Sequence, residues 1–184
     1  MAPHPAYAAY RAGDVVARAL PERAVGSFSR GVGKLAARAM RDRRRMVERH
    51  QLRVRPALNE EQLDAAVDGV FANYAHYWVE SFRLPEVSAD ELDRRMRAEG
   101  LHHITDALEQ GNGCILAMPH LGAWEWAAFW LTAVHGMDVT AVVEAVEPPE
   151  LAEWFVGLRA SLGIEVVPLD SKAGTATTRA LNAN

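Results

Sequence analysis

The sequence predicts an α/β protein in which an N-terminal amphipathic, helical region precedes a parallel-leaning β-sheet flanked by helices. Apolar residues recur at spacings of three and four over much of residues 1–110, as they do in amphipathic helices. From Gly111 onward, short apolar runs bounded by turn residues alternate with helix-like segments. Strands that alternate with helices in this way are typical of βαβ units and a parallel sheet.

Basic residues are concentrated in the first part of the chain. Residues 1–56 carry 13 Lys and Arg against 4 Asp and Glu, a net charge of +9, whereas residues 57–184 carry 7 against 20, a net charge of −13. Such an asymmetry indicates a basic arm that meets an anionic surface, either a membrane or nucleic acid. We therefore expect a basic, amphipathic membrane-docking region over 1–56 and an α/β core over 57–184, helical over 57–110 and βαβ over 111–184.

The composition excludes several classes of protein. A chain that is 49% hydrophobic and 24% charged can bury a core and is not disordered. A single cysteine, Cys114, excludes a disulfide framework and a cysteine-rich metal site. The N-terminus lacks the pattern of a secretory signal. The least polar stretch, 111–137, is interrupted by Pro119, Gly122 and Glu125, so we expect no membrane span and a soluble, cytoplasmic chain.

Helical segments account for the first part of the chain. We expect helices over 7–20 and 28–50, separated by a break that starts at Pro21. In the second helix one face is apolar and carries Val32, Leu35, Ala36, Ala39 and Met40. The densest positive patch consists of Arg41, Arg43, Arg44 and Arg45. A basic amphipathic helix of this kind can lie in the interface of an anionic membrane, and the alternative is a solvated helix face.

Helix-capping residues and short apolar runs predict where the remaining helices and strands lie. Asn59 and Ser88 are expected N-cap residues, the first of a helix over 59–82 and the second of a short helix with Glu91 in a capping box. Strands are predicted over 114–119, 139–146 and 164–169. The helices between and after them are predicted over 123–134, over 149–162 and within 173–184.

The residues best suited to carry out a chemical reaction are His120 and Glu125. His120 lies at the carboxyl end of a predicted strand, where open α/β sheets bind ligands. On a continuous helix the two side chains would point about 140° apart, but a strand–turn–helix arrangement with Gly122 in the turn lets Glu125 reach the imidazole. A carboxylate bonded to one ring nitrogen raises the basicity of the other, which can take a proton from a hydroxyl that attacks an acyl thioester.

Structural explanations exist for the same residues. His120 could cap a strand end while Glu125 complements the dipole of the next helix. The adjacent His102 and His103 point in different directions on a helix, so we expect no shared metal ion. The aromatic residues after the motif belong either to a core helix or to the wall of an acyl-chain groove: Trp124, Trp126, Phe129 and Trp130.

The segment PHLGAWEWAA (119–128) resembles the H-x4-[DE] motif of the bacterial lipid acyltransferases, the group that contains the lipid A lauroyl/myristoyl acyltransferases. Further segments resemble its actinobacterial branch, the phosphatidylinositol mannoside acyltransferases. These are YAHYWVESFRLP (74–85), residues 144–170 and KAGTATTRAL (172–181). The blocks occur in the family's order, and the resemblance covers nearly the whole chain.

The resemblance implies a glycerolipid-acyltransferase-like fold and a peripheral protein at the cytoplasmic face of the cell membrane, docked on anionic lipid. It implies transfer of a long fatty acyl group from acyl-CoA to a mannose hydroxyl of a phosphatidylinositol mannoside. His120 would be the general base and Glu125 its orienting carboxylate. Glu144 matches an acidic site position, and Arg159 matches a basic one that could pair with Glu144 or bind a phosphate. The alternative is that neither has a role in the site: Glu144 would be a charge at the end of a strand, and Arg159 a solvated helix residue.

We expect no metal, no nucleotide cofactor and no nucleic-acid partner, because the chain lacks the usual motifs for metals and nucleotides; acyl-CoA enters as a substrate. Members of the resembled family continue past the position that matches Asn184, so we expect a C-terminally truncated member. Two alternatives stay open. One is a related acyltransferase with another acceptor or an acyl carrier protein as donor, and the other is an inactive fragment that only binds an anionic surface.

Overall fold

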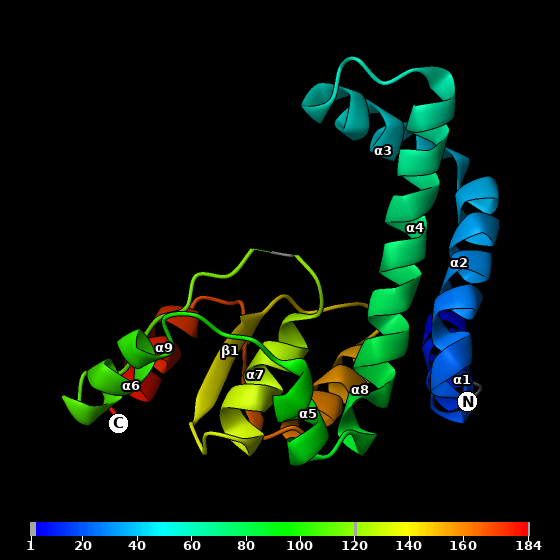
Figure 1. Cartoon of the computed structure of the whole chain (residues 1–184). Helices are drawn as coiled ribbons and strands as arrows, with labels where there is room; N and C mark the ends of the chain where they lie inside the picture. Colours follow the sequence, from blue (N-terminus) through cyan, green and yellow to red (C-terminus); the bar gives the residue numbers. More distant parts are fainter. Residues whose placement is uncertain (1–2, 120, 184) are drawn as a thin grey trace. The chain divides into compact units, whose positions relative to one another are not determined.

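The computed structural model of the chain describes residues 3–119 and 121–183, which form two compact units. A helical unit spans residues 11–83, and an α/β unit joins residues 84–183 to the start of the first helix, up to Tyr10. Figure 1 labels most of the helices and strands and colours them from the N-terminus to the C-terminus. Their bounds are α1 (Pro5–Ala19), α2 (Glu22–Ala39), α3 (Arg41–Val54), α4 (Glu60–Arg83), a 3-10 helix η1 (Leu84–Glu86), α5 (Ala89–Arg95), α6 (His102–Glu109), α7 (Trp124–Ala133), β1 (Val139–Val143), α8 (Pro149–Ala160), β2 (Ile164–Pro168) and α9 (Ala173–Leu181).

A close contact between α2 and α4 holds the helical unit together. A Cβ atom at Gly33 would lie 2.5 Å from the backbone N and Cα atoms of Ala72 on α4, so the two helices approach as closely as only a glycine permits. Val67 and Phe71 of α4 pack here against Ala37. The buried residues of α2 recur every four positions, the spacing of a ridge on one helix face: Val25, Ser29, Gly33 and Ala37.

Gly33→Ala is expected to lower the free energy of unfolding by about 1–3 kcal/mol, because the added methyl group meets helix backbone rather than a flexible side chain. Gly31→Ala is the matched control, since a Cβ at Gly31 of the same helix meets nothing within 4 Å. It should stabilise the protein by about 0.5–1 kcal/mol through helix propensity. Urea denaturation followed by circular dichroism measures both variants. Equal effects of the two substitutions would contradict the close contact.

The N-terminal helices differ in part from their prediction. The break at Pro21 is confirmed, since α2 begins directly after it. The single helix predicted over 28–50 is wrong, because Met40 leaves helical geometry (φ −101°, ψ 63°) and separates α2 from α3. Only part of the predicted apolar face of α2 packs on α4: Ala36 contacts the cluster there, whereas Val32 and Leu35 are 41% and 68% exposed.

Both predicted N-caps are confirmed. The backbone N–H of Gln62 donates to Asn59 Oδ1 (2.9 Å), and the N–H of Asn59 donates to Gln62 Oε1 (3.1 Å). The N–H of Glu91 donates to Ser88 Oγ (3.2 Å). These bonds satisfy donors that a helix start leaves without intrahelical partners, so they fix where α4 and α5 begin.

A two-stranded parallel sheet forms the centre of the α/β unit. β1 and β2 pair in register from Val139 opposite Ile164 to Val143 opposite Pro168, and α8 connects them. Ile164 and Val167 are both buried. Because side chains alternate along a strand, these two lie on opposite faces, so the neighbouring helices cover both faces of the sheet. The α/β class and the parallel pairing are therefore confirmed.

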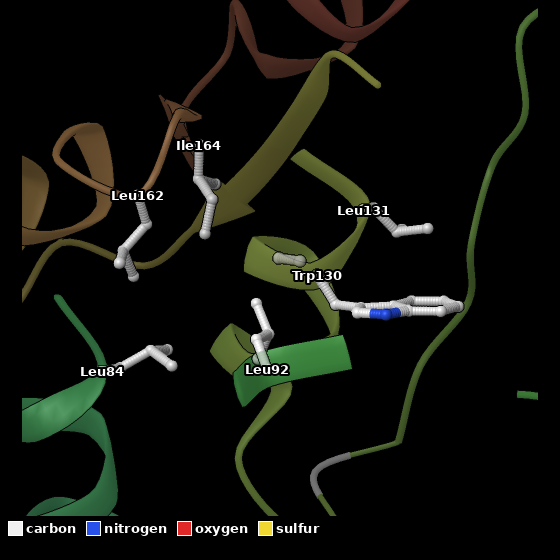
Figure 2. Close-up of a cluster of buried hydrophobic side chains, with 7 residues drawn as sticks. Leu84, Leu92, Trp130, Leu131, Leu162 and Ile164 are labelled. Carbon is white, nitrogen blue, oxygen red and sulfur yellow. The ribbon is translucent and has the colours of Figure 1, made fainter. Parts of the chain in front are cut away.

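The core of this unit gathers around α7 (Figure 2). The indole N–H of Trp130 donates to Asp93 Oδ1 at 2.9 Å, which satisfies the polar atom of this buried ring. The cluster also includes Leu84, Leu92, Ala128, Leu131, Leu162 and Ile164. Trp124, Trp126 and Phe129 pack against it as partly buried side chains. Of the two predicted alternatives, α7 is therefore a core helix.

The start of α1 belongs to the α/β unit. Tyr10 contacts Phe155 of α8 edge to face, with ring centroids 5.4 Å apart. Such aromatic pairs favour this geometry and contribute beyond simple burial. This unit is therefore built from two separate stretches of the chain.

The strand predicted over 114–119 is not formed. These residues have no regular secondary structure, and the sheet that the described residues form contains only β1 and β2. Ile115, Leu116 and Met118 are 71%, 45% and 48% exposed. An apolar run becomes a strand only where a neighbouring strand pairs with it and a packed layer covers it. Among the described residues no strand pairs with 114–119.

Candidate active site

The predicted catalytic residues belong to the segment that leads into α7. His120 lies outside the described residues. Gly122 has a φ of +71°, the left-handed conformation that the predicted tight turn requires and that favours glycine. Glu125 lies in the first turn of α7, and its side chain is 6% exposed. The turn and the helix start are as predicted, while the pairing of His120 with Glu125 stays a prediction.

Glu125 forms an ion pair with Arg159, which lies in the last turn of α8. The Nη2 atom of Arg159 donates to Glu125 Oε1 at 3.2 Å, and the Arg159 side chain is 15% exposed. The resemblance implied that Arg159 could pair with Glu144 or a phosphate, and the carboxylate that it contacts in the structure is that of Glu125. Glu144 is exposed and follows directly after β1, as predicted for a strand-end residue.

Aromatic rings surround the guanidinium of Arg159. Its Cζ atom lies 5.2 Å from the ring centroid of Trp124 and 5.6 Å from that of Phe155. Both distances are in the range of cation–π attraction. The Nε atom of Arg159 is buried and has no hydrogen-bond partner among residues 3–119 and 121–183. The sequence identified Arg159 as a site residue but gave no signal for this contact, because it depends on how α7 and α8 pack.

The arrangement places two opposite charges in a largely desolvated position. Ions removed from water are costly unless each has a partner, so the carboxylate and the guanidinium hold each other in place. A carboxylate fixed in this way can accept a hydrogen bond from an imidazole and orient it. Glu125 therefore has the burial and the support that an orienting carboxylate needs.

The candidate metal ligands do not assemble. Within the described ranges, no three His, Cys, Asp or Glu side chains lie close enough together to hold a metal ion. The rings of His102 and His103 lie side by side, with centroids 4.0 Å apart, at the start of α6.

The arginines predicted to dock on a membrane differ in their exposure and in their ion pairs. Arg44 contacts Asp64 (2.7 Å), Asp68 (3.0 Å) and Glu48 (3.1 Å), and its side chain is 22% exposed. The hydrogen bond to Asp68 raises the pKa of Arg44, so it stays charged. By contrast, Arg45 is 74% exposed. Arg44 therefore ties α3 to α4, whereas its neighbours Arg41, Arg43 and Arg45 are exposed.

An apolar stripe on α2 lies apart from the α4 contact. It consists of Phe28, Val32, Leu35 and Ala39, which share one helix face by their spacing. Phe28 is half-buried, and the other three are exposed. No helix in the described part of the chain is long and apolar enough to cross a membrane.

Comparison with known proteins identifies the family. A family model described as bacterial lipid A biosynthesis acyltransferase matches residues 2–182. The chain belongs to this acyltransferase family. It is 38% identical over 164 residues to a phosphatidylinositol mannoside acyltransferase of Mycobacterium tuberculosis, which covers 88% of this chain and 51% of the relative.

A second relative with the same name comes from Mycolicibacterium smegmatis. It is 36% identical over 161 residues, which covers 87% of this chain and 52% of the relative. This member of the acyltransferase family thus spans about half the length of the curated relatives it matches. The resemblance inferred from the H-x4-[DE] motif and the separated sequence blocks is confirmed.

Proposed function

We propose that this member of the family transfers a long fatty acyl group from acyl-CoA to a mannose hydroxyl of a phosphatidylinositol mannoside. The names of its relatives support this acceptor, and the family supports acyl transfer. One observation carries the proposal: a buried carboxylate, Glu125, is held by Arg159 five residues after His120. We assign His120 as the general base and Glu125 as the carboxylate that orients it.

The proposed reaction needs no covalent intermediate on the protein. The His120 imidazole takes the proton of the mannose hydroxyl while the hydroxyl oxygen attacks the thioester carbonyl carbon. Backbone N–H groups at the start of α7 can stabilise the resulting oxyanion. The tetrahedral intermediate then collapses, the carbon–sulfur bond breaks, and the imidazolium returns the proton to the leaving thiolate. Glu144, exposed at the end of β1, is assigned to substrate binding.

The test is transfer of labelled palmitate from palmitoyl-CoA to phosphatidylinositol dimannoside by this chain and by its His120→Ala variant. A labelled glycolipid that is lost in the variant would support the reaction and its base. Equal product from both proteins would contradict the role of His120. Competition with other lipid acceptors, and replacement of palmitoyl-CoA by acylated acyl carrier protein, separate this reaction from that of a related acyltransferase. Vesicle binding with no product from either protein would favour the alternative of a non-catalytic membrane binder.

We also propose that the protein works as a peripheral protein on the anionic, cytoplasmic face of the cell membrane. The apolar stripe of α2 is suited to enter the interface, and exposed cations lie on the adjoining helix at Arg41, Arg43 and Arg45. Each basic side chain near an anionic leaflet contributes about 1 kcal/mol of attraction. Arg44 contributes less, since its guanidinium is engaged by carboxylates of the chain.

Val32→Glu is expected to weaken binding to vesicles that contain phosphatidylinositol by about tenfold or more. The change removes an apolar side chain whose burial is worth about 1.5–3 kcal/mol and adds a charge that anionic lipids repel. Val156→Glu is the matched control, because Val156 on α8 has a similar exposure, 43% against 41% for Val32. Vesicle co-sedimentation measures both variants. An equal loss of binding would contradict docking through α2.

A further inference from the structure

We propose that a pocket where α2, α3 and α4 meet binds the phosphodiester headgroup of an anionic phospholipid through Arg38, Arg41 and Arg45. The inference rests on the proposed membrane docking and deepens it. Docking by charge alone needs only exposed cations, whereas this pocket holds one phosphate group in a fixed place. It also adds Arg38, which is not among the arginines predicted to dock on a membrane.

The three arginines come from two helices and line one pocket of about 610 Å³ in the helical unit (Figure 1). Arg38 lies in the last turn of α2, and Arg41 and Arg45 lie on α3, which begins directly after Met40. Since Arg41 and Arg45 are four residues apart, they share one face of α3. Arg43 lies about 160° around the helix from both of them and does not line the pocket. The pocket therefore selects some of the exposed arginines and leaves out others.

The guanidinium groups of Arg38 and Arg41 are available to a ligand. Both side chains are exposed, and neither forms an ion pair or a side-chain hydrogen bond within residues 3–119 and 121–183. Arg45 approaches Asp42 only to 3.8 Å, and both side chains of this pair are largely exposed, so the pair contributes little. A guanidinium presents up to five donors in a plane that matches the oxygens of a phosphate. The pocket therefore offers donors that suit a phosphate group.

The charge of the pocket lining favours a phosphodiester. The lining also carries three carboxylates, and Arg44 contacts all of them: Glu48, Asp64 and Asp68. Together, four arginines and three carboxylates of the described residues give the lining a formal charge of +1. A phosphodiester carries a single negative charge and neutralises this lining, whereas a phosphate dianion exceeds it.

Apolar side chains beside the pocket indicate that the phosphate belongs to a lipid. Leu35 lies three residues before Arg38, on the neighbouring part of the same helix surface, and is 68% exposed. Met40, between Arg38 and Arg41 in the chain, is 44% exposed. A phospholipid places hydrocarbon beside its phosphate, so it can cover these side chains while its phosphate meets the arginines. Inorganic phosphate offers them no partner.

The experiment measures binding of a soluble lipid, so it depends neither on vesicles nor on acyl transfer. Dibutanoyl phosphatidylinositol is titrated into the full chain labelled with 15N-arginine, and the Nε–Hε signals of the side chains are followed by NMR. We expect saturable shifts that fit one site. Arg38→Gln and Arg41→Gln should each weaken binding about tenfold or more, because each removes charge-assisted hydrogen bonds to the phosphate. Inorganic phosphate, the second ligand, should bind at least tenfold more weakly than the lipid.

Arg43→Gln is the matched control, because it removes the same charge from α3 outside the pocket. We expect native affinity for the soluble lipid in this variant. Since Arg38, Arg41 and Arg43 are all exposed, the three variants should keep the native helix content, which circular dichroism measures.

Each outcome decides the inference. Equal losses of affinity in Arg38→Gln and Arg43→Gln, or no saturable binding, would overturn it. Equal affinities for inorganic phosphate and the soluble lipid would overturn the lipid as the ligand. Co-sedimentation of the native chain with vesicles that contain phosphatidylinositol tests the proposed docking separately. Vesicle binding without soluble-lipid binding would remove only the pocket, whereas saturable lipid binding by a chain that does not sediment with vesicles would support the pocket and contradict the docking.

Discussion

Glu125→Gln is expected to transfer acyl groups about 10²–10⁴-fold more slowly than the native chain. Glutamine has the shape of glutamate but no negative charge, so it cannot stabilise the imidazolium that forms when His120 takes the hydroxyl proton. The amide oxygen can still accept the hydrogen bond from Arg159, which preserves the contact between α7 and α8. Initial rates with palmitoyl-CoA and phosphatidylinositol dimannoside measure the effect.

Glu153→Gln is the control for this loss, because Glu153 lies on α8 and is exposed. It removes the same charge from the chain at an exposed position outside the motif, and we expect native rates. Circular dichroism of both variants confirms that the helices are retained. A Glu125→Gln variant that is folded and transfers at the native rate would show that Glu125 is a structural carboxylate.

Arg159→Met is expected to lower the free energy of unfolding by about 3–5 kcal/mol. The substitution keeps the apolar stem but leaves the carboxylate of Glu125, 6% exposed, without the guanidinium. The loss of the charged partner of a buried ion is among the few changes that destabilise a protein to this extent. Thermal or urea denaturation of the native chain and the variant measures the difference.

The double variant Glu125→Gln/Arg159→Met separates the ion pair from the packing of the side chains. In the double variant neither of these two positions holds a buried charge, so most of the lost stability should return. Arg95→Met removes an arginine that is 40% exposed and should cost far less. Effects of the two single substitutions that simply add in the double variant would show that Glu125 and Arg159 do not interact.

Elements with local start and stop signals could be predicted from the sequence. Asn59 and Ser88 mark helix starts through hydrogen bonds that span only three residues, so their effect does not depend on the rest of the fold. The parallel pairing of β1 with β2 follows from two short apolar runs separated by one helix. The break at Met40 could not be predicted, because apolar and basic residues continue through it at helical spacing.

The failed strand over 114–119 has a different cause. Its composition is that of a buried strand, but strand formation depends on a neighbour, and no pattern within six residues reveals whether one is present. The same limit applies to the site. The turn at Gly122 and the place of Glu125 in the first turn of a helix could be predicted, because both depend on residues within one short segment. The partner of Glu125 could not, because Arg159 lies 34 residues further along the chain.

The two-part construction of the α/β unit determines the order in which the chain can fold during synthesis. Residues 11–83 are continuous, so the helical unit can assemble as soon as they leave the ribosome. The contact between Tyr10 and Phe155 cannot form until Phe155 has been translated. This happens 145 residues later, or after about 7–30 s at typical rates of synthesis. During that interval the first turns of α1 lack the aromatic partner that they contact in the folded α/β unit.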